Sequence, residues 1–94
     1  MVDSAKIISA ILKLDESSSV KNTLIALYVQ NRPMTVASLN SALNLQKTLD
    51  NYLALLKDVM ELGYVSILEA KDYRSVTRKH FLLNLEPILD TIEE

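Results

Sequence analysis

The sequence has no cysteine, which excludes disulfide bonds and thiolate metal sites. A single glycine, Gly63, leaves no glycine-rich loop to cradle a phosphate. A single histidine, His80, has no second histidine with which to form a zinc site. Neither a serine–glycine elbow nor a pair of carboxylates at catalytic spacing is present. We therefore expect no enzymatic activity, no metal and no cofactor.

Long apolar runs are also missing, since a run such as residues 24–29 is far too short to cross a bilayer. Residues 1–6 lack the basic-then-apolar order of a signal peptide. The 94 residues suit one domain, and 49% of them are apolar, which is enough for a core. The sequence predicts a soluble cytoplasmic protein, associated with the nucleoid if it binds DNA.

Positive charge is scarce and unevenly distributed. The net charge is −2, whereas binding to DNA phosphates needs Lys and Arg. Residues 71–80 nevertheless hold four basic residues and one acid, a balance of +3, which leaves −5 on the rest of the chain. A basic segment on an acidic body is a usable footprint for nucleic acid, although a solvated turn with ordinary surface charges has the same composition.

Apolar spacing and capping residues predict five helices. They cover residues 4–15 after Asp3, 20–30 after three serines, 36–43 after Thr35, 46–62, and a last segment from residue 85 after Asn84. Met34 is a candidate for a very short strand. Gly63 follows the fourth helix directly, where a left-handed residue commonly ends a helix.

After Gly63 the period of the sequence changes. Residues 64–68 and 76–83 favour two strands, joined by a polar turn at residues 71–75. Phe81 and Leu83 are expected to face the core, which puts Thr77 and Lys79 on the same side unless the strand twists or bulges. The order of elements predicts a mainly α fold with a small β-hairpin, the plan of a winged helix-turn-helix.

Four segments carry a resemblance to a known family. They are TVASLNSALNL (residues 35–45), TLDNYLALL (48–56), ELGYV (61–65) and RKHFLLN (78–84). Over residues 20–94 the chain resembles PadR-like and MarR-like winged helix-turn-helix regulators. The resemblance implies one domain over residues 1–94, with the helix-turn-helix at about 35–62, the wing at about 64–83 and terminal dimerisation helices at about 4–15 and 85–93. Two features depart from the family: the wing lacks tip glycines, and acids stand at Asp50, Asp58 and Glu61 of the reading helix.

The resemblance implies a duplex-DNA site. Gln46, Lys47 and Asn51 would reach base edges in the major groove, because Gln and Asn pair with adenine and Lys donates to guanine. Backbone contacts would come from Ser38, Thr48, Lys71, Arg74, Arg78 and Lys79, with Arg74 closest to the minor groove. The alternative is that these are merely polar residues on exposed faces. Tyr73 either packs on a sugar or folds back onto the hairpin.

The apolar residues of the two terminal helices predict a homodimer, because the body of a chain of this length is too small to bury all of them. The expected interface residues are Ile7, Ile8, Ile11, Leu85, Ile88, Leu89 and Ile92. Such an interface would set two reading helices about one DNA turn, ~34 Å, apart. The alternative is that both helices only cap the core of a single chain.

Three functions fit these expectations. The first is a transcriptional repressor that occupies a promoter as a homodimer. The second is a centromere-binding or spreading protein in DNA partition. The third, favoured by the acidic balance, is a winged-helix module that binds a partner protein and no DNA.

Overall fold

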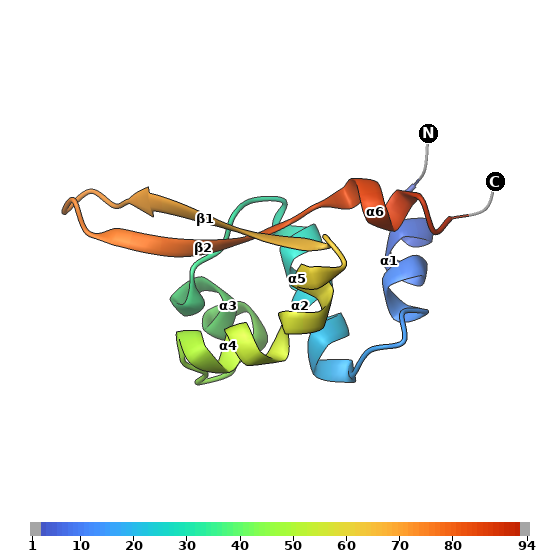
Figure 1. Cartoon of the computed structure of the whole chain (residues 1–94), viewed down its shortest axis with the longest axis horizontal. Coiled ribbons are helices and arrows are strands. Elements are labelled where there is room, and N and C mark those ends of the chain that lie inside the picture. The colour runs from blue at the N-terminus through green and yellow to red at the C-terminus, as the bar shows by residue number, and fades with distance from the viewer. Residues whose placement is uncertain (1–2, 93–94) are drawn as a thin grey trace.

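Residues 3–92, which the computed structural model describes, form six helices and one antiparallel hairpin (Figure 1). In chain order they are α1 (Ser4–Leu12), α2 (Ser18–Gln30), α3 (Val36–Leu43), α4 (Leu49–Leu55), α5 (Lys57–Glu61), β1 (Val65–Lys71), β2 (Thr77–Leu83) and α6 (Leu85–Leu89). The fold is mainly α, with 52% helix. Residues 1, 2, 93 and 94 lie outside the described residues. The expected end of the last helix, at residue 93, is among them.

Short polar side chains begin the first four helices. Asp3, Ser17, Thr35 and Thr48 each accept a hydrogen bond from the amide three residues further on. Each such cap is worth about 1 kcal/mol. At the other end, α2 and α3 stop at Asn31 and Asn44, whose φ angles of 52° and 55° are left-handed and suit asparagine better than most residues. The starts of α1 and α3 agree with the sequence-based boundaries, whereas α2 begins two residues earlier than expected, at Ser18. α1 also ends earlier than expected, at Leu12.

The helix expected over residues 46–62 is wrong at its start. The Thr48 hydroxyl accepts the amide of Asn51 (3.2 Å), and the Asn51 side chain accepts the amide of Thr48 (3.0 Å). This capping box starts α4 only at Leu49. Gln46 and Lys47 therefore lie in the turn before the helix.

The same expected helix is also bent at Leu56, where the backbone (φ −96°, ψ 5°) leaves the helical region and α5 begins. Its hydrogen bonds continue across the bend, since the Leu56 amide donates to the Tyr52 carbonyl and the Leu56 carbonyl accepts the Met60 amide. Leu56 and Val59 are both buried. The bend thus lets two short helices bury their apolar sides in one core.

The hairpin is longer than the sequence indicates, because β1 continues to Lys71 and pairs there with Thr77. Its register runs without a bulge from the pair Val65–Leu83 to the tip. The outer half projects beyond the helical body, which gives the molecule extents of 46 × 25 × 24 Å (Figure 1). Phe81 is therefore buried while Thr77 and Lys79, on the same face, are exposed.

Phe81 joins the hairpin to the helices. Its amide and carbonyl exchange hydrogen bonds with the backbone of Met34 (2.7 and 2.9 Å), which confirms the expected short strand as an isolated bridge. Its ring packs against Tyr52 of α4 at a centroid distance of 5.9 Å. The other buried apolar residues around it are Ile7, Ile11, Val20, Leu24, Leu27, Leu39, Leu56, Val59, Val65 and Ile88. Helices followed by this hairpin are consistent with a winged-helix-like fold.

The C-terminal helix differs from expectation in length and in its cap. α6 spans Leu85–Leu89, and Asn84 makes no side-chain cap bond. The side-chain nitrogen Nδ2 of Asn84 instead donates to the Gly63 carbonyl (3.0 Å) and to the Ser66 hydroxyl (2.7 Å). These two bonds close the base of the hairpin. α6 packs against α1 through Ile88, so both terminal helices contribute to the core of one chain.

Neighbouring residues of α1 provide a test of this packing. Ile11 is fully buried and Leu12 is 52% exposed. We expect Ile11→Ala to lower the free energy of unfolding by about 2–5 kcal/mol, because it leaves a cavity in the core. Leu12→Ala should cost less than about 0.5 kcal/mol. Urea denaturation at one protein concentration measures both, and equal losses in the two variants would contradict the burial of α1.

Candidate nucleic-acid interface

Two polar side chains at the start of α3, the N-cap Thr35 and Ser38, are hydrogen-bonded to each other. The Thr35 hydroxyl accepts the amide of Ser38 (3.1 Å) and donates to the Ser38 hydroxyl (3.0 Å). Ser38 is half-buried as a result. It retains a hydroxyl proton that can reach a phosphate, but its oxygen is already an acceptor.

The turn between α3 and α4 carries two of the predicted base-contacting residues. Gln46 is exposed, and Lys47 is half-buried with its main chain bonded to the side chain of Asn40. Both residues therefore stand in an ordered turn ahead of the helix, and not on the helix itself.

Asn51 lies in the first turn of α4 and is exposed. Its side-chain oxygen accepts the Thr48 amide, so its NH₂ group must face away from that amide. Paired contact with adenine needs both the oxygen and the NH₂ group. With the oxygen in the capping box, the free donors suit acceptor atoms such as guanine O6 and N7 better than the expected adenine pair.

The wing tip is ordered by one carboxylate. Asp72 accepts the amides of Arg74 (2.8 Å) and Val76 (3.1 Å), and its other oxygen pairs with Arg78 Nε at 3.2 Å. Ser75 completes the turn with a left-handed φ of 61°. Arg78 is therefore ion-paired inside the wing.

Two further residues mark the tip. Tyr73 is 91% exposed, and the Arg74 guanidinium lies over its ring at 5.3 Å from the centroid. Tyr73 thus pairs with its neighbour and does not fold back onto the hairpin. Lys79 stands opposite Glu69 in the strand register, and Lys71 opposite Thr77.

A groove lies between the first turns of α3 and α4 and strand β2 of the hairpin. It has a volume of about 500 Å³ and is lined by Thr35, Val36, Ala37, Leu49, Thr77, Arg78 and Lys79. The structure thereby brings Arg78 and Lys79 onto one concave surface with the first turns of α3 and α4. Arg74 lies beyond this groove, at the wing tip, and Lys71 stands at the tip end of β1.

The residues predicted for a dimer interface lie in different environments. Ile7, Ile11 and Ile88 are buried in the core of a single chain and therefore offer no surface to a second copy. Leu85 and Ile92 pack partly against that core, and Ile8 is half-buried. Leu89 is 37% exposed. Among the residues predicted for the interface, these last four are the ones with atoms accessible to a second copy.

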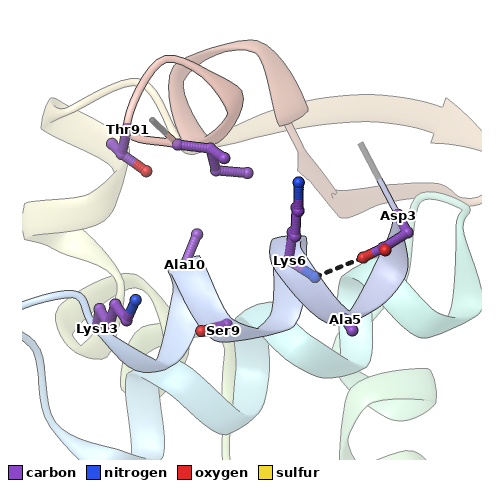
Figure 2. Close-up of a pocket in the computed structure, with 8 residues that line it drawn as sticks. Asp3, Ala5, Lys6, Ser9, Ala10, Lys13 and Thr91 are labelled. Atoms are coloured by element: carbon purple, nitrogen blue, oxygen red, sulfur yellow. Dashed lines mark hydrogen bonds between the residues drawn. The ribbon is translucent and has the colours of Figure 1, made fainter. Parts of the chain in front are cut away.

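A second groove, of about 510 Å³, lies between α1 and the C-terminal segment (Figure 2). Lys6 and Ala10 of α1 and Lys13, directly after α1, line it on one side, and Thr91 and Ile92 line it on the opposite side. α1 and α6 lie at the end of the molecule away from the wing tip (Figure 1). The groove therefore belongs to a surface separate from that of α3, α4 and the hairpin tip.

The remaining candidates for chemistry are sparse. His80 is half-buried, and its Nδ1 lies 3.2 Å from the carbonyl oxygen of Arg78. Within residues 3–92, no three His, Asp or Glu side chains gather as a metal site would require. Nor does any helix in that part of the chain have the length and apolar character of a membrane span.

Comparison of the chain with protein-family models, with curated proteins and with solved structures finds no match. The winged-helix-like arrangement therefore rests on the order and packing of the elements themselves. The sequence does not reveal the hydrogen-bonding roles of two residues of this surface, Asp72 and Asn40; Asn40 was expected to contact the DNA backbone or to be a simple surface residue. Asp72 has a usable signal, since Asp commonly bonds backbone amides a few residues ahead in turns. Asn40 has none, because its partner Lys47 lies seven residues away.

The wing carboxylate predicts a pH response. The amide of Val76 holds the pKa of Asp72 below its ordinary value of 3.8, outweighing the rise from partial desolvation, with Arg74 and Arg78 adding to the decrease. A lowered pKa in the folded state stabilises the wing above pH about 4, and this contribution is lost as the pH falls through the lowered pKa. Carboxyl NMR titration should give a midpoint below 3.8 for Asp72.

Two variants separate the causes of this shift. Arg78→Ala should leave the pKa of Asp72 below 3.8, because the backbone donors remain. Asp72→Asn keeps the acceptor for those donors and removes the titration, so the amides of Arg74 and Val76 should no longer respond between pH 2 and 4. A normal Asp72 midpoint in the wild-type protein would show that the wing loop is not held by this carboxylate.

Proposed function

We propose that this protein binds duplex DNA through α3, α4 and the wing, and acts as a homodimeric transcriptional repressor of the PadR-like or MarR-like kind. The observation that carries the proposal is the groove between the first turns of α3 and α4 and strand β2. Arg78 and Lys79 line this groove, so two cations of β2 face the same space as Thr35 and the first residues of α3 and α4. A DNA backbone is the extended anion that such a concave, basic surface suits.

The roles of the residues follow from their exposure and partners. Gln46, Lys47 and Asn51 contact base edges from the turn and the first turn of α4. Lys71 and Lys79 contact phosphates, and Arg74 reaches the minor groove from the wing tip. Ser38, Thr48 and Arg78 contact the backbone as well, although Arg78 must share its charge with Asp72.

The bend at Leu56 divides the acids of the expected reading helix between two helices. Three acids on a single reading helix would repel phosphates. Asp58 and Glu61 lie on α5, beyond the bend, and only Asp50 remains on α4. The reading helix itself is therefore less acidic than its sequence indicates.

Removal of two wing cations tests the proposal. We expect Arg74→Ala/Lys79→Ala to weaken binding to a fluorescent mixed-sequence duplex, measured by anisotropy between about 50 and about 200 mM salt. The plot of log K against log salt should lose about one unit of slope for each phosphate contact removed. Footprinting of wild-type protein then distinguishes a repressor, which protects one or two sites, from a partition protein, whose protected region spreads with concentration.

A charge-matched variant controls for net charge. Lys6→Ala/Lys13→Ala removes the same charge from α1 and the residue directly after it, at the opposite end of the molecule (Figure 1), and should keep the wild-type slope. If both double variants weaken binding equally, the wing is not the contact surface. If the wild-type protein binds no duplex at low salt, the DNA-binding proposal fails and a protein-interaction module becomes the better hypothesis.

The homodimer has its own test. We expect the wild-type protein in sedimentation equilibrium to have twice the chain mass of 10.6 kDa. Ile8→Glu/Leu89→Glu should shift it to a single chain, because burying two carboxylates in an apolar contact is costly. Leu62→Glu, at an exposed leucine of the segment before the wing, should leave the mass unchanged. A wild-type mass of one chain at all concentrations would contradict the homodimer without bearing on DNA contact by one copy.

A further inference from the structure

One side chain of α3 holds the turn that leads into α4. The Nδ2 atom of Asn40 donates to the carbonyl oxygen of Lys47 (2.8 Å), and its Oδ1 atom accepts the amide of Lys47 (3.1 Å). Both main-chain polar groups of Lys47 are thus bonded to a single amide side chain, in the way that a neighbouring strand would bond them. The direction of the Lys47 Cα–Cβ bond is fixed relative to α3.

The same Asn40 oxygen is bonded to the reading helix. The Tyr52 hydroxyl donates to Oδ1 at 2.7 Å, and the Tyr52 ring is fully buried against Phe81. Asn40 therefore links α3, the turn and α4 at one point. Because Tyr52 is anchored in the core, this link is rigid and is not a contact between two mobile surface groups.

The rest of the turn depends on the same residue. The carbonyl oxygen of Asn40 accepts the amides of Asn44 and Leu45. The hydrogen bonds that the structure describes for residues 44–47 all end on Asn40. Leu45 is 39% exposed and Gln46 is exposed, so apolar packing contributes little to the order of these residues.

We propose that Asn40 is the positioning residue of the DNA-reading turn: it holds Lys47 and Gln46 at a fixed place beside the first turn of α4. This inference rests on the proposed function. Non-specific affinity comes mainly from charge and tolerates a loose turn, whereas base contacts need side chains held in register. Loss of Asn40 should therefore reduce discrimination between DNA sequences more than it reduces overall affinity.

The experiment has two measurements on the full chain. The first is amide hydrogen exchange by NMR without DNA, where Asn40→Ala should speed exchange at Lys47 by roughly tenfold while amides of β1 and β2 keep their wild-type rates. The second is the ratio of affinities for a duplex selected by the wild-type protein from a random library and for an unrelated duplex of equal length. This ratio should fall by roughly fivefold or more in Asn40→Ala.

Two conservative variants keep the test independent of gross unfolding. Asn40→Asp retains acceptors for the Lys47 amide and the Tyr52 hydroxyl but places an oxygen against the Lys47 carbonyl, so it should also release Lys47. Tyr52→Phe keeps the buried ring and removes only the bond to Asn40, and should give a smaller change of the same kind. Asn22→Ala, at an exposed asparagine of α2, is the matched control and should change neither measurement.

The outcomes separate this inference from the proposed function. Unchanged exchange at Lys47 in Asn40→Ala overturns the positioning role, and so does a uniform rise in exchange at every amide, which indicates general destabilisation. An affinity ratio that stays at the wild-type value also overturns it. A wild-type protein that selects no duplex overturns DNA binding and the reading role of the turn, while the exchange data still decide whether Asn40 fixes Lys47.

Discussion

The attachment of the wing to the helical body depends on Phe81. A two-stranded hairpin is marginally stable on its own in water, so its position must come from packing against something else. Phe81 supplies this in two ways, because its backbone pairs with Met34 ahead of α3 and its buried ring packs on Tyr52 of α4. One residue of β2 thereby sets the position of the hairpin relative to both α3 and α4.

Tyr52 extends this constraint from the core to the surface. Burial raises its pKa above the ordinary value of 10.0, so the hydroxyl keeps its proton and remains a donor over the whole physiological range. That donor meets Asn40, and Asn40 meets the main chain of Lys47. A continuous series of contacts therefore runs from Phe81 to the turn before α4. The wing and the turn are fixed to one another through the interior, although they do not need to touch at the surface.

Local rules account for the parts of the fold that the sequence predicts. Thr35 and Asp3 cap their helices, Gly63 takes a left-handed φ of 83°, and the change of period after it gives the hairpin. Each of these features is decided by residues within one or two turns of each other. The order of elements and the mainly α class followed from such signals.

The parts that escaped prediction are decided by partners distant in the sequence. The bend at Leu56 has no proline or glycine to announce it and reflects the burial of Leu56 and Val59 in a common core. Asn84 has the composition of a cap, but at the base of the hairpin it meets Gly63 and Ser66 first. The sequence alone does not decide whether the apolar residues of the terminal helices face a second copy or the core of one chain, and Ile7, Ile11 and Ile88 are buried within one chain, where α1 contacts α6.

The charges of the wing bear on how an acidic protein would hold DNA. Arg78 is paired with Asp72, and Lys79 faces Glu69 across the strands, so the +3 balance of residues 71–80 overstates the charge that one wing offers to phosphate. Lys71 stands opposite the uncharged Thr77 in the strand register, and the Arg74 guanidinium lies over the Tyr73 ring. With so few contacts, one copy gains little from counterion release. Two copies on one duplex bind with a high effective concentration, and sequence-specific affinity under the proposed function then comes from the pair. Under the proposed function, dimerisation and DNA binding would therefore be linked by charge, and a single copy of this chain would discriminate poorly between sequences.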